Sequence, residues 1–291
     1  MNTTTHTEEQ AVSKASTTAT ADLSPLQAVI FDWAGTLVDF GSLAPTQIFV
    51  EAFASFGISI TLAQARGPMG LSKWDHIYQL LQDESIAAQW QTRFGHSPGN
   101  EDVDAIYARF MPMQIAKVGE FSAPIDGAVQ TLQWLRDQGL KIGSCSGYPR
   151  EVLNQLLPQA AAAGVQPDYV VAGDELEAGG RPGPYMALSN VLALAVSDVR
   201  ACVKVDDTVP GIAEGLNAGM WTVGLSLSGN EVGYSLQEFA NAPEDEVNAR
   251  VASAEAKLKK AGAHYVVRSV IDLPDVLQSI AAEMRAGRKP V

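Results

Sequence analysis

Short apolar runs alternate with stretches of helical periodicity along most of the chain. Each run has the length and the β-branched or aromatic content of a buried strand. Such alternation is typical of a parallel sheet with helices on both faces, so we predict a doubly wound α/β core. The predicted strands are residues 28–31, 140–143, 169–172, 201–205, 221–225 and 265–267, and the predicted helices are residues 128–137, 150–162, 185–194, 211–218 and 244–260.

The segment from residue 44 to residue 120 departs from this alternation. It contains no convincing buried strand, and its apolar positions recur with helical spacing. We therefore predict a helical cap domain, residues 44–120, inserted into a core domain of residues 25–43 and 121–291. The helical pattern is clearest at residues 47–53, 73–81 and 103–113.

Two further segments are predicted from composition. Residues 1–24 are rich in Thr, Ser, Ala and Glu and show no periodicity, which predicts a disordered tail. The helix at residues 244–260 is rich in Ala, Glu and Lys, so we interpret it as a solvated surface helix without a role in the site.

Composition narrows the classes of partner. The chain of 291 residues is 46% hydrophobic, which is ample for a packed interior. Acidic residues outnumber basic ones 33 to 20 and the net charge is −13, which argues against a nucleic-acid or membrane surface. An anionic small-molecule substrate must therefore be captured by a local cationic site.

Location and redox state follow from two further features. No apolar run approaches the roughly 18 to 20 residues of a membrane span, and the first residues lack the apolar core of a signal peptide, so we predict a cytoplasmic protein. Cys145 and Cys202 lie within or beside predicted core strands, where buried reduced thiols are the ordinary case.

The first predicted strand delivers a carboxylate, Asp32, into a turn that contains glycine, in the sequence AVIFDWAGT at residues 28–36. The carboxyl ends of strands are where an open α/β sheet places its chemistry. A single aspartate there most often only caps a turn. Other polar groups follow the later strands, however, and together they favour a functional site: Ser146, Gly147, Arg181, Asp206 and Asp207.

A lysine in the predicted cap is a candidate for covalent chemistry. Lys73 lies in the sequence PMGLSKWDH, residues 68–76, and shares a helix face with His76 three residues later. A lysine amine that condenses with an aldehyde forms an iminium, which accepts the electrons of a breaking bond. The alternative is an exposed helical lysine, the common fate of this residue type.

These motifs resemble the phosphonoacetaldehyde hydrolase (phosphonatase) family of the haloacid dehalogenase-like superfamily, over about residues 26–284. In the superfamily an aspartate attacks phosphorus and a second aspartate, two residues later, protonates the leaving group. The second position is here Ala34, and Ala34 together with Lys73 specifies the phosphonatase family. The resemblance implies hydrolysis of the C–P bond of phosphonoacetaldehyde to acetaldehyde and phosphate, in 2-aminoethylphosphonate degradation.

The resemblance also implies roles for individual residues. Asp32 forms an aspartyl phosphate, Lys73 forms a Schiff base, and His76 transfers protons, a role that Tyr148 shares as an alternative. Mg²⁺ is the implied cofactor, held by Asp32, the Ala34 carbonyl and Asp207, while the role of Asp206 stays open and Gly211 replaces a further superfamily acid. The implied substrate-binding residues are Ser146, Gly147, Arg181, Met69 and Tyr148.

Two other functions are weighed against this one. A phosphatase or phosphomutase of the same superfamily needs an acid at Ala34, and a regulatory descendant is expected to have lost Asp32, Ser146 or Asp207. Neither signature is present in the sequence. The family further implies a homodimer formed through the cap helices.

Overall fold

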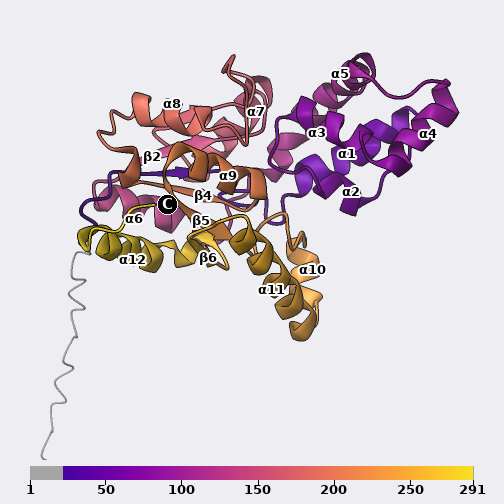
Figure 1. Ribbon diagram of the computed structural model, residues 1–291. Coiled ribbons are helices and arrows are strands. Elements are labelled where there is room, and N and C mark those ends of the chain that lie inside the picture. Colours follow the sequence, from indigo (N-terminus) through magenta and orange to yellow (C-terminus); the bar gives the residue numbers. More distant parts are fainter. Residues whose placement is uncertain (1–21, 291) are drawn as a thin grey trace, which may run out of the picture.

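The computed structural model describes residues 22–290, in which a six-stranded sheet carries helices on both faces and a separate group of helices lies beside it (Figure 1). The strand order is β3-β2-β1-β4-β5-β6 and every neighbouring pair is parallel. The predicted doubly wound α/β core is confirmed. The strands are β1 (Ala28–Phe31), β2 (Lys141–Cys145), β3 (Tyr169–Val171), β4 (Cys202–Asp206), β5 (Trp221–Leu225) and β6 (Tyr265–Val267).

Alternate residues of the central strand face two separate apolar cores. Val29 and Phe31 pack with the helices of one face, whereas Ala28 and Ile30 pack with those of the other. Burial on both faces explains why this strand reads as a continuous apolar run. One face carries α6 (Ala128–Asp137), α7 (Arg150–Ala162) and α12 (Leu273–Arg285), and the other carries α8 (Tyr185–Ala193), α9 (Val209–Ala218) and α11 (Glu244–Lys260).

The interpretation of residues 244–260 as a solvated helix is wrong for one of its faces. Val247, Val251 and Ala254 are buried against Val232 and neighbouring residues, and further along the helix Leu258 packs under β5. The sequence of this helix is rich in alanine and charged residues, so its regular apolar stripe was not recognised, because the buried residues are small or few. The helix is therefore part of the layer that covers the sheet.

Five helices form the group beside the sheet, at the right of Figure 1. Their apolar faces share a core of their own, built around Phe49, Phe53, Ile77, Trp90 and Phe110. The helical character predicted for this segment is confirmed. The helices are α1 (Leu43–Ser55), α2 (Leu62–Arg66), α3 (Lys73–Leu81), α4 (Glu84–Phe94) and α5 (Asn100–Lys117).

Two linkers join this helical group to the sheet and run side by side. The backbone N–H of Asp39 in the first linker donates to the carbonyl of Ala123 in the second. The Asp39 carboxylate accepts from the backbone N–H groups of Leu43 and Ala44 and so caps α1, where the helix dipole favours an anion. Asp39 thus holds both linkers and the first cap helix together.

The remaining elements are short: α10 (Leu236–Asn241), η1 (Val118–Phe121), η2 (Val199–Ala201) and η3 (Val270–Asp272). The sequence did not predict α2, α4, α10 and α12 individually. Almost all of the predicted tail, residues 1–24, lies outside the described residues.

Two predictions concern the chain as a whole. Both cysteines are buried and unpaired, as predicted. Between residues 22 and 290, the helices are each too short or too polar to cross a bilayer. The cytoplasmic location stays a prediction.

Candidate active site

The strand order brings the predicted polar residues to one place. Asp32 follows β1, Ser146 follows β2, and Asp207 follows β4, and these three strands are neighbours in the sheet. From β1 the chain passes to β2 and β3 on one side of the sheet, and later to β4, β5 and β6 on the other. The carboxyl ends of β1 and β4 therefore form a topological switch point, where open α/β sheets bind ligands. The site therefore lies where the fold class predicts it.

The cap contributes Lys73 from above this edge. Lys73 is the first residue of α3, and the side chain of Ser72 caps the helix by accepting from the N–H of Asp75. The preceding loop lies directly on the core, because a Cβ atom at Gly147 would be 2.5 Å from the Leu71 carbonyl oxygen. Only glycine at position 147 permits this close approach.

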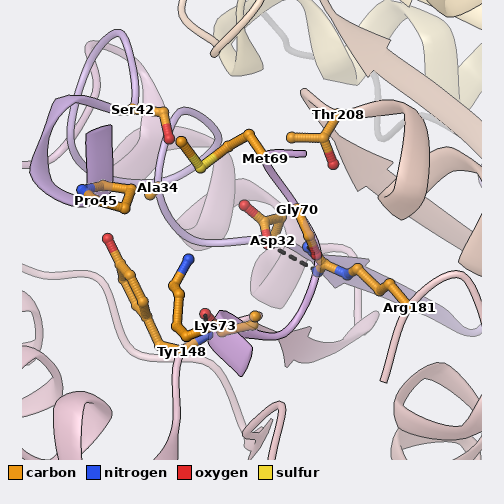
Figure 2. Close-up of a pocket in the computed structure, with 12 residues that line it drawn as sticks. Asp32, Ala34, Ser42, Pro45, Met69, Gly70, Lys73, Tyr148, Arg181 and Thr208 are labelled. Atoms are coloured by element: carbon orange, nitrogen blue, oxygen red, sulfur yellow. Dashed lines mark hydrogen bonds and ion pairs between the residues drawn. The ribbon is translucent and has the colours of Figure 1, made fainter. Parts of the chain in front are cut away.

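Asp32 and Lys73 line the same small cavity (Figure 2). Its volume is about 20 Å³, which is room for about one water molecule. A molecule of the size of phosphonoacetaldehyde requires the cap to move or the side chains to rearrange. The other lining residues are Ala34, Ser42, Pro45, Met69, Gly70, Ser146, Gly147, Tyr148, Arg181 and Thr208.

The environment of Lys73 favours its neutral form. The side chain is 4% exposed, and burial lowers the pKa of Lys73 to about 7, although Asp32 acts in the opposite direction. Its amine lies 4.8 Å from the centre of the Tyr148 ring. A substantial fraction of the amine is therefore unprotonated and nucleophilic at neutral pH.

Asp32 is held by Arg181. The Nη2 of Arg181 lies 2.7 Å from Oδ1 of Asp32, the contact drawn as a dashed line in Figure 2. Burial raises the pKa of Asp32 to about 6, and Arg181 limits the rise. The same guanidinium also reaches the Cys145 carbonyl, 3.1 Å from Nη2, and the Gly70 carbonyl, 3.4 Å from Nη1. Arg181 thus contacts both Asp32 and the cap loop.

Two residues behind Arg181 complete a buried ion network that sequence reasoning missed. Glu214 accepts from Nε of Arg181 at 2.9 Å, and Lys204 lies 3.4 Å from the same carboxylate oxygen. Lys204 also donates to Asp206 at 2.8 Å, and Asp206 lies 3.3 Å from Arg181. The sequence did contain a signal for this network, because Lys204 lies inside a predicted core strand and a buried charge needs a partner. Asp206, two residues later on the same face of the strand, is that partner.

Asp206 and Asp207 have different surroundings. Burial alone raises the pKa of Asp206, but Arg181 and Lys204 hold it below its ordinary value. Asp207 accepts instead from the hydroxyl of Thr36 and from the N–H of Asn230, and burial next to Asp32 raises the pKa of Asp207 well above its ordinary value. Asp207 has no cationic partner among the described residues.

The network contains more acids than cations, and this excess suits a divalent metal. Oxygen atoms of three buried aspartates lie within 4.8 Å of one another. Hard oxygen donors of this kind are the ligands that Mg²⁺ prefers. With Asp207, which lies beside the network, the carboxyl groups outnumber the cations by four to two: the carboxyl groups are those of Asp32, Asp206, Asp207 and Glu214, and the cations are Arg181 and Lys204.

His76 lies behind Lys73 and does not line the cavity. Its ring stacks on Phe49 with centroids 3.9 Å apart, and its Nε2 is 2.9 Å from the Ala65 carbonyl, so this nitrogen carries the proton. Burial, and then Lys73, lower the pKa of His76 well below its ordinary value. His76 is neutral here, with an unpartnered Nδ1 as its only acceptor.

The remaining predicted residues lie around the cavity. The Ser146 oxygen accepts from the Tyr148 N–H at 3.0 Å, which leaves its own hydroxyl proton free to donate. Met69 and Tyr148 are both almost fully buried in the lining. The residues predicted for substrate or metal binding therefore line the cavity, except Asp207, which lies next to Asp32 in the buried aspartate cluster. His76 also does not line the cavity and lies one layer back.

Comparison with known proteins agrees with this arrangement. A family model described as haloacid dehalogenase-like hydrolase matches residues 26–219. Over 92% of its length the chain is 56% identical to the phosphonoacetaldehyde hydrolase of Vibrio cholerae serotype O1, covering 99% of that protein, and 56% identical to that of Salmonella typhimurium, covering 100% of it. The chain belongs to the phosphonoacetaldehyde hydrolase family.

A solved structure supports the same assignment. The phosphonoacetaldehyde hydrolase-like protein from Oleispira antarctica superposes with a TM-score of 0.90 at 42% identity, and the alignment covers 92% of this chain and 97% of that one. The expected family membership and fold are confirmed, and the chain is a hydrolase.

Within this phosphonoacetaldehyde hydrolase family member, Asp206 and Gly211 form a complementary pair. A Cβ atom at Gly211 would lie 1.9 Å from Cγ of Asp206, so the Asp206 carboxylate occupies the space that a side chain at position 211 requires. The superfamily acid at this position is therefore sterically excluded. Thr208, which caps α9, donates to the same carboxylate and fixes it there.

We predict that Gly211→Ala destabilises the protein although alanine is the better helix former. The added methyl group must displace Asp206 from Lys204 and Arg181, and breaking a buried ion pair costs about 3–5 kcal/mol. Urea unfolding measures this cost. Gly99→Ala is the matched control, since Gly99 is exposed and has open space around its Cβ position, and its effect should stay within about 1 kcal/mol. Equal stability of the two variants would contradict the pairing.

Proposed function

We propose that this protein hydrolyses the C–P bond of phosphonoacetaldehyde to acetaldehyde and phosphate, as the names of its relatives state for those proteins. One observation carries the proposal: a buried lysine with a pKa of about 7 faces the same cavity as Asp32, while the position two residues after Asp32 is Ala34. The usual acid for the leaving group is missing, and an amine suited to an aldehyde lies opposite.

In this proposal the phosphonate lies at the carboxyl ends of the strands. The Ser146 hydroxyl and the Gly147 N–H donate to its oxygens, and Arg181 contributes its charge. Asp32, the Ala34 carbonyl and Asp207 would hold Mg²⁺, whose charge offsets that of the phosphonate oxygens. The cluster of three buried aspartates, with more carboxyl groups than cations around it, supports a divalent ion, and Asp206 is kept in its ion pairs.

The reaction begins at Lys73. Its neutral amine attacks the aldehyde carbon, and protonation of the resulting hydroxyl group and its loss as water give an iminium. An oxygen of Asp32 then attacks phosphorus in line, and the electron pair of the C–P bond moves into the iminium to form an enamine. Protonation of the enamine carbon and addition of water release acetaldehyde and restore the amine. Water also cleaves the aspartyl phosphate, which releases phosphate and restores Asp32.

The division of the chain is part of the proposal. Residues 44–120 form the cap and residues 25–43 and 121–291 form the core, and the cap opens and closes on the core in each catalytic cycle. The small volume of the cavity supports this motion, since the substrate cannot enter without it. His76 or Tyr148 carries proton transfers next to Lys73. The homodimer through the cap stays a prediction.

A phosphatase or phosphomutase is the second candidate of the same fold. These reactions need an acid at the position of Ala34 to protonate an oxygen leaving group, and among the described residues Asp32 is the only carboxylic acid that lines the cavity. Phosphate release from phosphonoacetaldehyde and from p-nitrophenyl phosphate, both measured with Mg²⁺, separates the candidates. Dominant turnover of the ester would favour the second.

We expect Lys73→Arg to abolish phosphate release, because arginine keeps the charge but forms no imine under these conditions. Borohydride added with substrate should give a covalent adduct at Lys73 in the wild type, detected by peptide mass spectrometry. Asp32→Ala should still form this adduct while it loses phosphate release. Substantial phosphate release by Lys73→Arg would exclude the imine route.

Adduct formation should depend on pH through the amine of Lys73. The folded-state pKa of about 7 lies below the ordinary value, so the nucleophilic neutral form is lost as the pH falls through 7. Trapping with cyanoborohydride should therefore fall about tenfold between about pH 8 and pH 6 and level off above. A trapping rate that keeps rising to pH 10, as for an ordinary lysine, would show that burial does not tune this amine.

Removal of the metal tests the proposed ligands. Chelation should abolish phosphate release, and added Mg²⁺ should restore it. Asp207→Asn should weaken Mg²⁺ binding at least about tenfold by calorimetry, because one of the carboxylates is lost. Asp198→Asn, an exposed acid paired with Arg200, is the control. Unchanged Mg²⁺ affinity in Asp207→Asn would remove this residue from the metal site.

A further inference from the structure

Arg66 crosses from the cap into the core. It is the last residue of α2, directly before the loop that carries Met69 and leads to Lys73. Its Nη1 donates to the carbonyl of Gly41 at 2.8 Å, and its Nη2 donates to the carbonyl of Gly233 at 3.0 Å. Both acceptors belong to segments outside the cap helices.

Asn230 contacts Arg66 and Asp207 at the same time. Its side-chain oxygen accepts from Nη1 of Arg66 at 3.2 Å, and its side-chain nitrogen donates to the Arg66 carbonyl at 3.2 Å. Its backbone N–H donates to Oδ2 of Asp207 at 2.7 Å. One residue of the core therefore joins a cap side chain to a proposed metal ligand.

The loop that contains Asn230, residues 226–234, is also fastened to the nucleophile segment. The Ser228 hydroxyl donates to the carbonyl of Gly35 at 2.9 Å, and the Ser228 carbonyl accepts from the N–H of Gly41 at 2.8 Å. These bonds hold the start and middle of the loop whether or not the cap is closed. Among the described residues, the hydrogen bonds between residues 226–234 and the cap helices all involve Arg66.

The guanidinium is held by carbonyl groups and an amide. Among residues 22–290, no carboxylate forms an ion pair with Arg66 at 4.0 Å or less. Several acceptors in different directions match the planar fork of arginine and not the point charge of lysine. Release of Arg66 from these acceptors therefore breaks hydrogen bonds but no direct ion pair.

We propose that Arg66 is a positioning residue that fastens the closed cap to residues 226–234 and, through Asn230, orients Asp207. The inference rests on the proposed function, in which the cap opens to admit substrate. When the cap opens, Arg66 leaves the carbonyls of Gly41 and Gly233, and Asn230 loses its side-chain partner. Closure and metal binding are thereby linked, and by reciprocity each favours the other.

Arg66→Ala tests the proposal, with Arg250→Ala as the matched control. Arg250 reaches the same loop, 3.5 Å from the Val232 carbonyl, but from α11 in the core, so it does not respond to the cap. We expect Arg66→Ala to lower kcat about tenfold to hundredfold, as for a misplaced catalytic group, and to weaken Mg²⁺ binding severalfold in calorimetry. Arg250→Ala should change neither by more than about twofold.

Two further measurements separate positioning from folding. Millimolar guanidinium should restore part of the lost kcat in Arg66→Ala, whereas ethylammonium at the same concentration should not. Borohydride should still trap acetaldehyde at Lys73 in Arg66→Ala, because this reaction needs the amine but no phosphorus chemistry. Asn230→Ala removes the same link from the core side and should reproduce both losses if Arg66→Ala fails to fold.

The outcomes are distinct. Wild-type kcat and Mg²⁺ affinity in Arg66→Ala and Asn230→Ala would overturn the proposal, as would a loss of kcat with unchanged Mg²⁺ affinity and no guanidinium rescue. If the wild type releases no phosphate from phosphonoacetaldehyde, the proposed function fails. The Mg²⁺ affinities of the variants then still decide whether Arg66 orients Asp207.

Discussion

The site depends on how four buried carboxyl groups are kept together, three at the ends of the adjacent strands β1 and β4 and that of Glu214 on helix α9. Arg181 contacts three of them, and Lys204 contacts two of those three. Without these cations, burial would favour the protonated forms of Asp32 and Asp206 still more strongly. Because the carboxyl groups outnumber the two cations, the same arrangement also provides oxygen ligands suited to a divalent ion.

The cap supplies what the core lacks. With Ala34 in place of an acid, the core has a nucleophile and no partner for a basic leaving group. Lys73 reaches the cavity only because the loop before α3 rests on Gly147. The same close packing excludes water from the lysine and lowers its pKa, so one packing contact delivers the amine and makes it nucleophilic.

The substitutions that distinguish this site act in pairs. Asp206 fills the space that a side chain at Gly211 would need, and the acid is thereby moved from the first turn of α9 to the end of β4. At the end of β4, the Asp206 carboxylate forms ion pairs with Lys204 and Arg181. Such exchanges leave the charge of the site similar while they change which residue carries it, because steric exclusion permits only one of the two side chains.

The sequence alone determined the sheet, most of its helices and most of the predicted site residues that line the cavity. Buried strands read as apolar runs, and chemistry at their carboxyl ends is a property of the fold class, so Asp32, Ser146 and Asp207 could be located without coordinates. Short cap helices such as α2 and the buried stripe of α11 were missed because few apolar positions mark them. Only the tertiary structure decided the partners: the ion pairs of Glu214 and Lys204, the position of His76 behind the cavity, and the reach of Arg66 to Asn230. These contacts join residues far apart in the chain, and local periodicity carries no information about which side chains meet across a packed interface.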